Sequence, residues 1–265
     1  MLTALDTGVS ALDQFQQDIN VIANNIANVN TVGFKSADVS FEDTLSETLG
    51  SNAAGSMQVG TGVMTASITN DFSTPGAITS TGVQSNLAVN GNGFFVVKDP
   101  TSGNTYVTQD GDFSIDNNGY LVTSSGMRVQ GSGGDIQFPV TATSPSMTGY
   151  TIASSGVITV NMSDGTTAAP TGGSLVLQNF TNPDQLVKVG GNLYSATAAA
   201  GGLAAPVAPG TSGTGSIVSG SLEMSNVDLA GQLTDLITAQ RAYEANAKII
   251  STSDEILQDI VNLKR

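Results

Sequence analysis

Residues 225–265 read SNVDLAGQLTDLITAQRAYEANAKIISTSDEILQDIVNLKR. An apolar side chain recurs at every seventh position: Leu229, Leu236, Tyr243, Ile250 and Leu257. A seven-residue apolar repeat keeps one stripe on one helix face and is typical of a coiled-coil seam. Ser225 and Asp228 have the spacing of a capping box, with Asp in place of the usual Glu. The stretch therefore predicts a long helix that begins in residues 225–228 and packs along another helix.

The apolar face of this helix is wider than one partner helix covers. The companion heptad position carries Leu233, Ala247 and Val261. A further seven-residue row lies one position ahead of Ile250 and Leu257: Ile249, Ile256 and Leu263. We therefore expect this helix to need several neighbours.

A second helical stripe occupies residues 2–29, at the other end of the chain. Its apolar side chains follow one another at gaps of three or four residues: Leu5, Val9, Leu12, Phe15, Ile19, Ile22, Ile26 and Val29. Asparagines crowd its last turns and Gly33 follows them. Asn lowers helix propensity and Gly readily forms a left-handed C-terminal cap, so we expect the helix to end near Asn30.

Two groups of polar residues on these helices have two interpretations each. The asparagines at the first helix end are Asn24, Asn25, Asn28 and Asn30. They form either a polar contact set between packed helices, which we favour, or a fraying helix end. Arg241 and Tyr243 make either a specific contact between subunits or an ordinary pair of a solvated charge beside a core aromatic.

The residues between the two helical stripes have a composition typical of β-structure. In residues 93–122, β-branched and aromatic runs alternate with the turn sequences 99–103 and 116–119, which predicts successive hairpins. Further strand candidates are bounded by Gly, Pro or Asn: residues 83–89, 127–130, 136–140, 150–160, 174–180, 186–195 and 216–224. Residues 49–62 and 196–215 are dominated by small residues, so we expect loops or linkers there.

These patterns predict an α+β protein in which long N- and C-terminal helices form a coiled-coil domain and the centre forms an antiparallel β-domain. We expect residues 1–33 and 225–265 to make up the helical domain. Residues 34–70 would be an extended linker, and residues 71–224 the β-rich domain.

Composition excludes most catalytic and nucleic-acid-binding classes. The formal charge is −14 and only 8 of 265 residues are basic, so no cationic surface for phosphates or anionic lipid is expected. The chain contains no Cys, His or Trp, which removes thiolate and imidazole nucleophiles and the usual zinc ligands. No residues are assigned to catalysis, to a cofactor or to a metal.

Weaker site motifs favour ordinary structure. The acidic residues after residue 109 lack the EF-hand pattern with its distant Glu, so hairpin turns explain them better than calcium. Gly91-Asn92-Gly93 precedes a predicted strand instead of opening a helix, which disfavours a phosphate site. A polysaccharide-acting enzyme with two carboxylates, and a surface adhesin or phage fibre, remain as alternative classes.

The helical ends are the candidate functional surface, because a single helix pair leaves part of each apolar face uncovered. We expect copies of the chain to cover these faces and build a polymer. The candidate interface residues are Leu5, Leu12, Phe15, Ile19, Ile22, Asn24, Asn25, Ile26, Asn28, Leu229, Leu233, Leu236, Tyr243, Ile250 and Leu257. The N-terminus has no signal-peptide pattern and no run of about 18 apolar residues occurs, so we expect no membrane insertion.

Three separated segments resemble the bacterial flagellar rod and hook proteins. Residues 21–35, VIANNIANVNTVGFK, are similar to the N-terminal signature of that family. Residues 225–229, SNVDL, with residues 239–248, AQRAYEANAK, resemble its C-terminal signature. GNGFFVV at residues 91–97 and DGDF at residues 110–113 resemble segments of the family's β-domain.

Within this family we favour a short hook subunit over a distal rod subunit. Residues 41–62 are shorter than we expect for a distal rod protein. Residues 179–183 and 191–197 resemble the hook more closely. The large outer domain that long hook proteins insert after a position like Gly131 is absent.

The resemblance implies a structural subunit of a hollow helical tube that transmits torque from rod to filament. It also implies export through the flagellar type III apparatus, with location in the hook or basal body. The implied partners are copies of the chain, the rod proteins, the hook cap and the hook–filament junction proteins.

Overall fold

The computed structural model describes residues 2–52, 55–139, 146–203 and 205–263, and it divides the chain into two compact units. The terminal unit comprises Met1–Val29, Ser36–Asp71 and Val227–Arg265. The central unit comprises Asn30–Lys35 and Phe72–Asn226. The α+β class is confirmed, because two long helices occur at the chain ends and the strands between them pair antiparallel.

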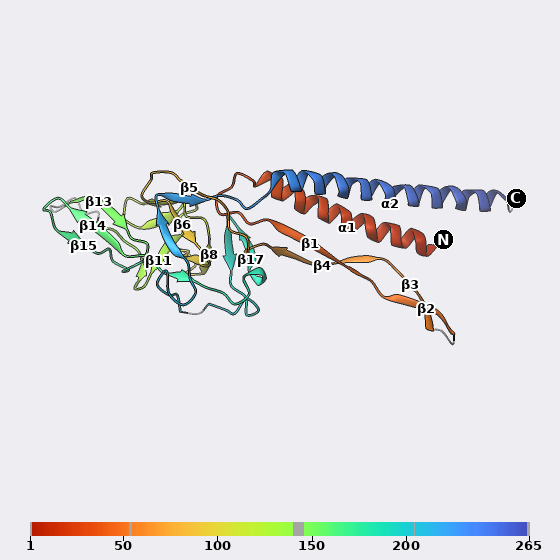
Figure 1. The fold of residues 1–265 in the computed structure, drawn as a ribbon, viewed down its shortest axis with the longest axis horizontal. Helices are drawn as coiled ribbons and strands as arrows, with labels where there is room; N and C mark the ends of the chain where they lie inside the picture. The colour runs from red at the N-terminus through yellow and green to blue at the C-terminus, as the bar shows by residue number, and fades with distance from the viewer. Residues whose placement is uncertain (1, 53–54, 140–145, 204, 264–265) are drawn as a thin grey trace. The chain divides into compact units, whose positions relative to one another are not determined.

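Two helices form the core of the terminal unit, where they lie side by side (Figure 1). Helix α1 spans Leu2–Ala27 and helix α2 spans Leu229–Leu263. Asp228 caps α2, since its Oδ1 accepts the Ala230 N–H at 3.1 Å. The expected capping box at Ser225 is therefore wrong by one turn. The predicted C-terminal residues Lys264 and Arg265 lie outside the described residues.

Helix α1 ends three residues earlier than the sequence predicted. The Asn28 N–H donates to the Asn24 carbonyl at 3.2 Å, and a turn follows through Asn30. Gly33 is left-handed as expected, with φ of 65°, but it does not cap α1. Its N–H donates instead to the Glu223 carbonyl at 2.8 Å, so Gly33 bends the chain within the central unit.

The terminal unit also contains four strands in a region for which a linker was expected. They are β1 (Ala37–Asp43), β2 (Ser46–Asn52), β3 (Gly55–Gly60) and β4 (Val63–Asn70). Strand β1 pairs with β4 and β2 pairs with β3, both antiparallel. The expectation of a loop over residues 49–62 is wrong for residues 49–52 and 55–60, which are paired as strands, whereas residues 53–54 lie outside the described residues.

A nine-stranded sheet with the order β17-β18-β8-β7-β11-β10-β9 organises the central unit, with β12 paired to β11 and β16 to β7. Its strands are β7 (Phe94–Lys98), β8 (Thr105–Thr108), β9 (Phe113–Ile115), β10 (Leu121–Thr123), β11 (Arg128–Gly131), β12 (Gly134–Asp135), β16 (Leu177–Gln178), β17 (Val187–Gly190) and β18 (Leu193–Ser195). Hairpins connect β7 to β8 and β9 to β10, as the turn sequences predicted.

Smaller sheets complete the central unit. Strand β5 (Ile78–Ser80) pairs with β20 (Ser221–Glu223), and β6 (Leu87–Asn90) pairs with β19 (Ser216–Ser219). A three-stranded sheet contains β13 (Met147–Ile152), β14 (Ile158–Met162) and β15 (Thr167–Ala168). A short 3-10 helix spans Pro183–Gln185. Residues 196–203 and 205–215 form turns and a single bridge, from Val207 to Leu177.

Three predicted strands are in fact hairpins or strand pairs. Residues 150–160 contain β13 and β14, and residues 186–195 contain β17 and β18. Residues 216–224 are interrupted at Gly220, which has a φ of 73°. Residues 136–139 form only isolated bridges, and residue 140 lies outside the described residues. Breaks of one to five residues escaped the sequence interpretation because their flanking runs look continuous.

The central unit has two apolar cores. The larger contains Phe95, Phe113, Phe138, Leu121 and Leu177, all almost fully buried. The smaller gathers Phe72, Phe94, Phe180 and Tyr194, whose ring centroids lie 5.1 to 6.4 Å apart. Burial raises the pKa of the Tyr194 hydroxyl. Strand alternation supplies both cores, since opposite faces of β7 carry Phe94 and Phe95.

A buried ion pair links the first segment of the central unit to its last strand, β20. Lys35 Nζ lies 2.8 Å from Glu223 Oε1, and the two side chains are 1% and 4% exposed. Lys35 also donates to the Thr74 carbonyl, and Glu223 Oε1 accepts the Gly76 N–H at 2.9 Å. Buried charges require such partners, so this pair links segments that are distant in sequence.

Candidate assembly surface

Helix α2 presents an unbroken seam to α1. At alternating steps of four and three residues, its side chains are buried or half-buried: Gln232, Leu236, Ala239, Tyr243, Asn246, Ile250, Ser253 and Leu257. Leu236, Tyr243, Ile250 and Leu257 are the heptad row that the sequence identified. The alternating spacing is the one expected for two helices packed along a shared face.

Helix α1 contributes a matching seam that begins with small residues. Gly8, Ala11, Ile22 and Asn25 are buried, and Phe15 is half-buried between them. A Cβ built on Gly8 would lie 3.2 Å from Ile250 Cγ1, so a glycine allows close approach there. Gly8 lies beside Ile250 and Asn25 beside Gln232, so the two helices run antiparallel.

The companion heptad row was predicted wrongly. Leu233 and Val261 are 45% and 66% exposed instead of facing α1. The actual companion row is Gln232, Ala239, Asn246 and Ser253. These residues share the seven-residue spacing but are small or polar, so an apolar search overlooks them.

Asn25 fixes the junction between the helices and strand β1. Its side chain is 1% exposed, and Nδ2 donates to the Ala37 carbonyl at 2.8 Å and to Gln232 Oε1 at 2.9 Å. Its Oδ1 accepts the Ala37 N–H at 3.0 Å. Within the asparagine group, Asn25 therefore makes a packed contact. Asn24 is exposed, and Asn28 Nδ2 bonds back to the Asn24 carbonyl at 2.9 Å, as at a helix end.

Large apolar residues of α2 remain exposed on several sides of the helix. These residues are between 43% and 86% exposed: Leu229, Leu233, Ile237, Ile249, Ile256, Ile260, Val261 and Leu263. So many exposed apolar side chains on one helix mark it as a candidate interaction surface. The set contains two of the predicted interface residues, Leu229 and Leu233.

The other predicted interface residues are distributed over the two helices. Half-buried positions are Leu5, Leu12, Phe15, Ile19, Ile26, Asn28, Leu236, Tyr243, Ile250 and Leu257. Ile22 and Asn25 are buried, and Asn24 is exposed. A role for these residues in contacts between copies stays a prediction.

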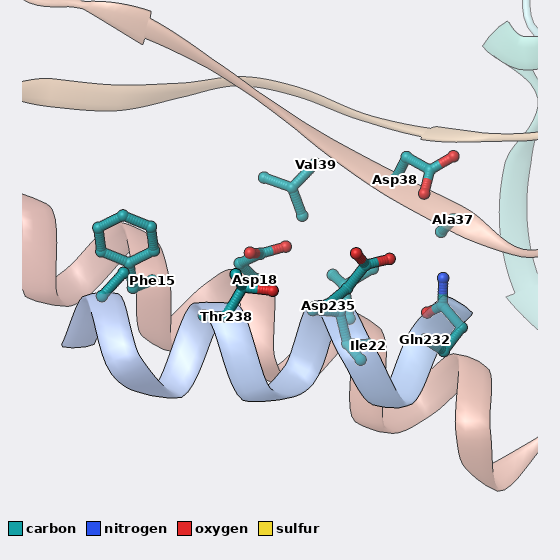
Figure 2. Close-up of a pocket in the computed structure, with 12 residues that line it drawn as sticks. Phe15, Asp18, Ile22, Ala37, Asp38, Val39, Gln232, Asp235 and Thr238 are labelled. Carbon is teal, nitrogen blue, oxygen red and sulfur yellow. The ribbon is translucent and has the colours of Figure 1, made fainter. Parts of the chain in front are cut away.

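Helices α1 and α2 and strand β1 border a groove of about 380 Å³ within the terminal unit. Its lining is partly apolar and includes Phe15, Ile22, Val39, Ala239 and Ala242. Figure 2 shows the carboxylates of Asp18 and Asp235 pointing from the helices toward the strand that carries Asp38.

Burial and neighbouring carboxylates raise the pKa of Asp18 and of Asp38 in the groove. Partial burial is the first cause of the raised pKa of Asp18, followed by the charges of Asp235 and Asp38. Burial also raises the pKa of Asp38, together with the charges of Asp71 and Asp235. Asp18, Asp38 and Asp235 make no ion pair within the described part of the chain. Their negative charge is therefore not balanced inside the terminal unit.

The acidic residues after residue 109 stabilise turns. Asp110 Oδ1 accepts the Asp112 N–H at 3.0 Å, and Asp116 Oδ1 accepts the Asn117 N–H at 2.7 Å. Over the described ranges, no group of three or more acidic side chains is arranged to hold a metal ion. Over the same ranges, neither helix combines the length and apolar character needed to cross a membrane.

Three family models match the chain in the order that the motifs suggested. Residues 5–35 match the flagella basal body rod protein family. Residues 88–160 match the flagellar hook protein FlgE/F/G D1 domain. Residues 218–263 match the C-terminal family of flagellar basal body rod FlgEFG proteins.

Several relatives that match along the whole chain are rod proteins. The chain is 44% identical to the flagellar basal-body rod protein FlgG of Bacillus subtilis, over 100% of both chains. It is 39% identical to the protein of the same name from Caulobacter vibrioides, over 99% of this chain and 100% of the relative. The flagellar hook protein FlgE of Brucella abortus is 27% identical, over 98% of each chain.

The preference for a hook subunit is wrong. The rod relatives align over 267 to 276 positions, close to the 265 residues of this chain, so the chain as a whole has the length of a rod protein. The hook relative needs an alignment of 396 positions, so it contains segments that this chain lacks. The local similarities at 179–183 and 191–197 did not separate the two subunit types.

Proposed function

The chain belongs to the family of flagellar basal-body rod and hook proteins, and from that premise we propose that it is a distal rod subunit. Family members are structural, so the chain is not an enzyme, and its place is the flagellar basal body. It assembles with other flagellar axial proteins. The observation that carries the rod assignment is the 44% identity to a rod protein over both entire chains.

In this proposal the subunit polymerises through its helical ends. The exposed large apolar side chains of α2 support polymerisation through the helices, because contact with a neighbouring subunit would remove these side chains from water. The paired seams of α1 and α2 support a coiled coil as the unit that packs in the tube wall. We place the helical domain at residues 1–33 and 225–265 and the β-rich domain at 71–224, with residues 34–70 joining them.

Export through the flagellar type III apparatus and contact with axial proteins above and below belong to the same proposal. A contact that repeats by rotation and rise builds an open helical tube. Helix α2, with 35 residues, would measure roughly 50 Å at 1.5 Å per residue, long enough to touch more than one neighbour.

Two truncations test the polymer assignment. Deleting residues 1–30 or 226–265 is expected to abolish polymers in electron micrographs. Circular dichroism should still report β-structure in both. Polymers that survive either deletion would defeat the proposal. For the rod assignment, the protein should be found in the rod of purified basal bodies, and its presence in the hook alone would contradict it.

A further inference from the structure

The cations of the terminal unit are few and lie on one helix. Its described residues contain two basic side chains, Arg241 and Lys248, both on the exposed surface of α2. Arg241 Nη1 lies 2.9 Å from Glu244 Oε2, and these side chains are 76% and 64% exposed. An ion pair so open to water contributes little stability, so Arg241 is available to a second acidic partner.

These cations share a helix face with an exposed apolar residue. At 3.6 residues per turn, Ile237, Arg241 and Lys248 project within about 40° of one another. Their common direction is roughly opposite the seam that α2 presents to α1. Leu233, at the edge of the same face, is also exposed. We call Leu233, Ile237, Arg241 and Lys248 the cationic face.

The groove offers the complementary chemistry. The groove is lined by apolar side chains of Phe15, Ile22 and Val39 together with carboxylates, whereas the cationic face sets apolar side chains beside cations. The raised pKa values of Asp18 and Asp38 mark negative charge that no base in the described terminal unit balances. Opposite charges across an interface fix its register and exclude wrong partners.

We propose that the groove of one copy receives the cationic face of a second copy. Within one chain this contact is impossible, because Asp235 and Thr238 line the groove from α2 itself, on a different side of the helix from Arg241. The contact joins two different surfaces, so each copy keeps one groove and one face free for further copies. Such a contact is heterologous and extends into an open polymer.

This inference deepens the proposed function by naming the surfaces that meet in the polymer, and it rests on that function. It also accounts for an acidic protein that associates with itself. Copies with a formal charge of −14 repel one another at long range, so their contact needs local charge pairing. The cationic face supplies two positive charges where the groove concentrates three negative ones.

Two full-length variants, each with one surface blocked, provide the test. The face variant carries Arg241→Glu and Lys248→Glu, and the groove variant carries Asp18→Lys and Asp235→Lys. Each alone is expected to raise the critical concentration for polymerisation by about tenfold or more, because like charges replace the pairing. Mixed at equal concentration, they should form polymers again with the two variants alternating, since the glutamates on the face of one variant pair with the lysines in the groove of the other. Analytical ultracentrifugation would measure these species.

Matched controls keep the test specific. Lys98→Glu changes an exposed cation of the central unit, and Asp13→Lys changes an exposed acid of α1; neither should alter the critical concentration. Circular dichroism must show intact helices in every variant. If the lysine substitutions perturb α1 or α2, Asp18→Asn with Asp235→Asn replaces them. Mixed with the face variant, this neutral variant is expected to form dimers that do not extend, because its groove no longer pairs with either face.

The outcomes separate this inference from the proposed function. Polymers restored in the mixture of the two charge-reversed variants, or dimers in the mixture that contains the asparagine variant, support the contact when neither variant polymerises alone. If both variants polymerise like the unaltered chain, or if the mixture stays monomeric, the contact is refuted while self-assembly stands. If the unaltered chain itself forms no polymer at any concentration, the proposed function fails first.

Discussion

Replacing Glu223 with Gln removes the negative charge from the buried pair and leaves the Lys35 ammonium with only neutral partners. The ammonium is 1% exposed, so water cannot take the place of the carboxylate. Removing one partner of a buried ion pair costs about 3 kcal/mol in the free energy of unfolding. Lys35→Met is expected to cost a similar amount, because Glu223 then keeps only the Gly76 N–H among its observed donors.

The double variant Lys35→Met, Glu223→Gln separates this explanation from general damage. Once one charge is gone, removing the other should add little. The double variant should therefore lose about 3 kcal/mol of the free energy of unfolding, instead of the roughly 6 kcal/mol that two independent losses would give. With a urea dependence of about 3 kcal/mol per molar, each variant lowers the unfolding midpoint by about 1 M.

The assay should follow the central unit by itself. Four of the five tyrosines, Tyr106, Tyr120, Tyr150 and Tyr194, lie in that unit, and the chain has no Trp. Tyrosine near-ultraviolet circular dichroism in urea therefore reports mainly on the central unit. Asp135→Asn is the matched control, because the Arg128–Asp135 pair is about one-third exposed and should cost at most about 1 kcal/mol. Equal losses for Glu223→Gln and Asp135→Asn, or additive losses in the double variant, would refute the reasoning.

Two further predictions concern the terminal unit. Asn25→Ala should lower the free energy of unfolding of this unit by about 2 kcal/mol, because the Ala37 N–H and carbonyl both lose their partner. The exposed control Asn24→Ala should change it by less than about 0.5 kcal/mol. Thermal unfolding followed by far-ultraviolet circular dichroism measures both variants, and equal effects would contradict the role of Asn25 at the junction. Asp38→Asn should raise the thermal midpoint of this unit at neutral pH, with Asp13→Asn as the exposed control. The pKa of Asp38 is raised in the folded state, so the unaltered protein gains stability as the pH falls from neutrality toward the ordinary Asp pKa of 3.8. The higher thermal midpoint of Asp38→Asn should therefore approach that of the unaltered protein over this pH range. An advantage that is constant with pH would argue against charge repulsion in the groove.

Much of the fold follows from local patterns. A period near 3.5 residues predicts both helices, because only a helix gathers such positions on one face. Of the heptad row that the same period identified, Leu236, Tyr243, Ile250 and Leu257 are half-buried, and Ile250 lies against Gly8 of α1. Turn sequences located the hairpins of residues 93–122, because Asp, Asn and Gly accept the backbone angles of tight turns.

Part of the candidate surface was beyond any local pattern. The companion seam of Gln232, Ala239, Asn246 and Ser253 is small and polar, so its burial depends on how closely α1 approaches, which Gly8 permits. Which apolar residues stay exposed, such as Ile237, is decided by where the partner helix lies.

By itself, the sequence determined that this chain has helical ends, an antiparallel centre, no catalytic chemistry and a place among the flagellar axial proteins. Only the tertiary structure decided the pairing of Lys35 with Glu223, the contact of Asn25 with Gln232, and the groove that unites Asp18, Asp38 and Asp235. The physical reason is range. Periodicity and turn chemistry act over a few neighbouring residues, whereas these contacts join segments that become neighbours only after the chain has folded.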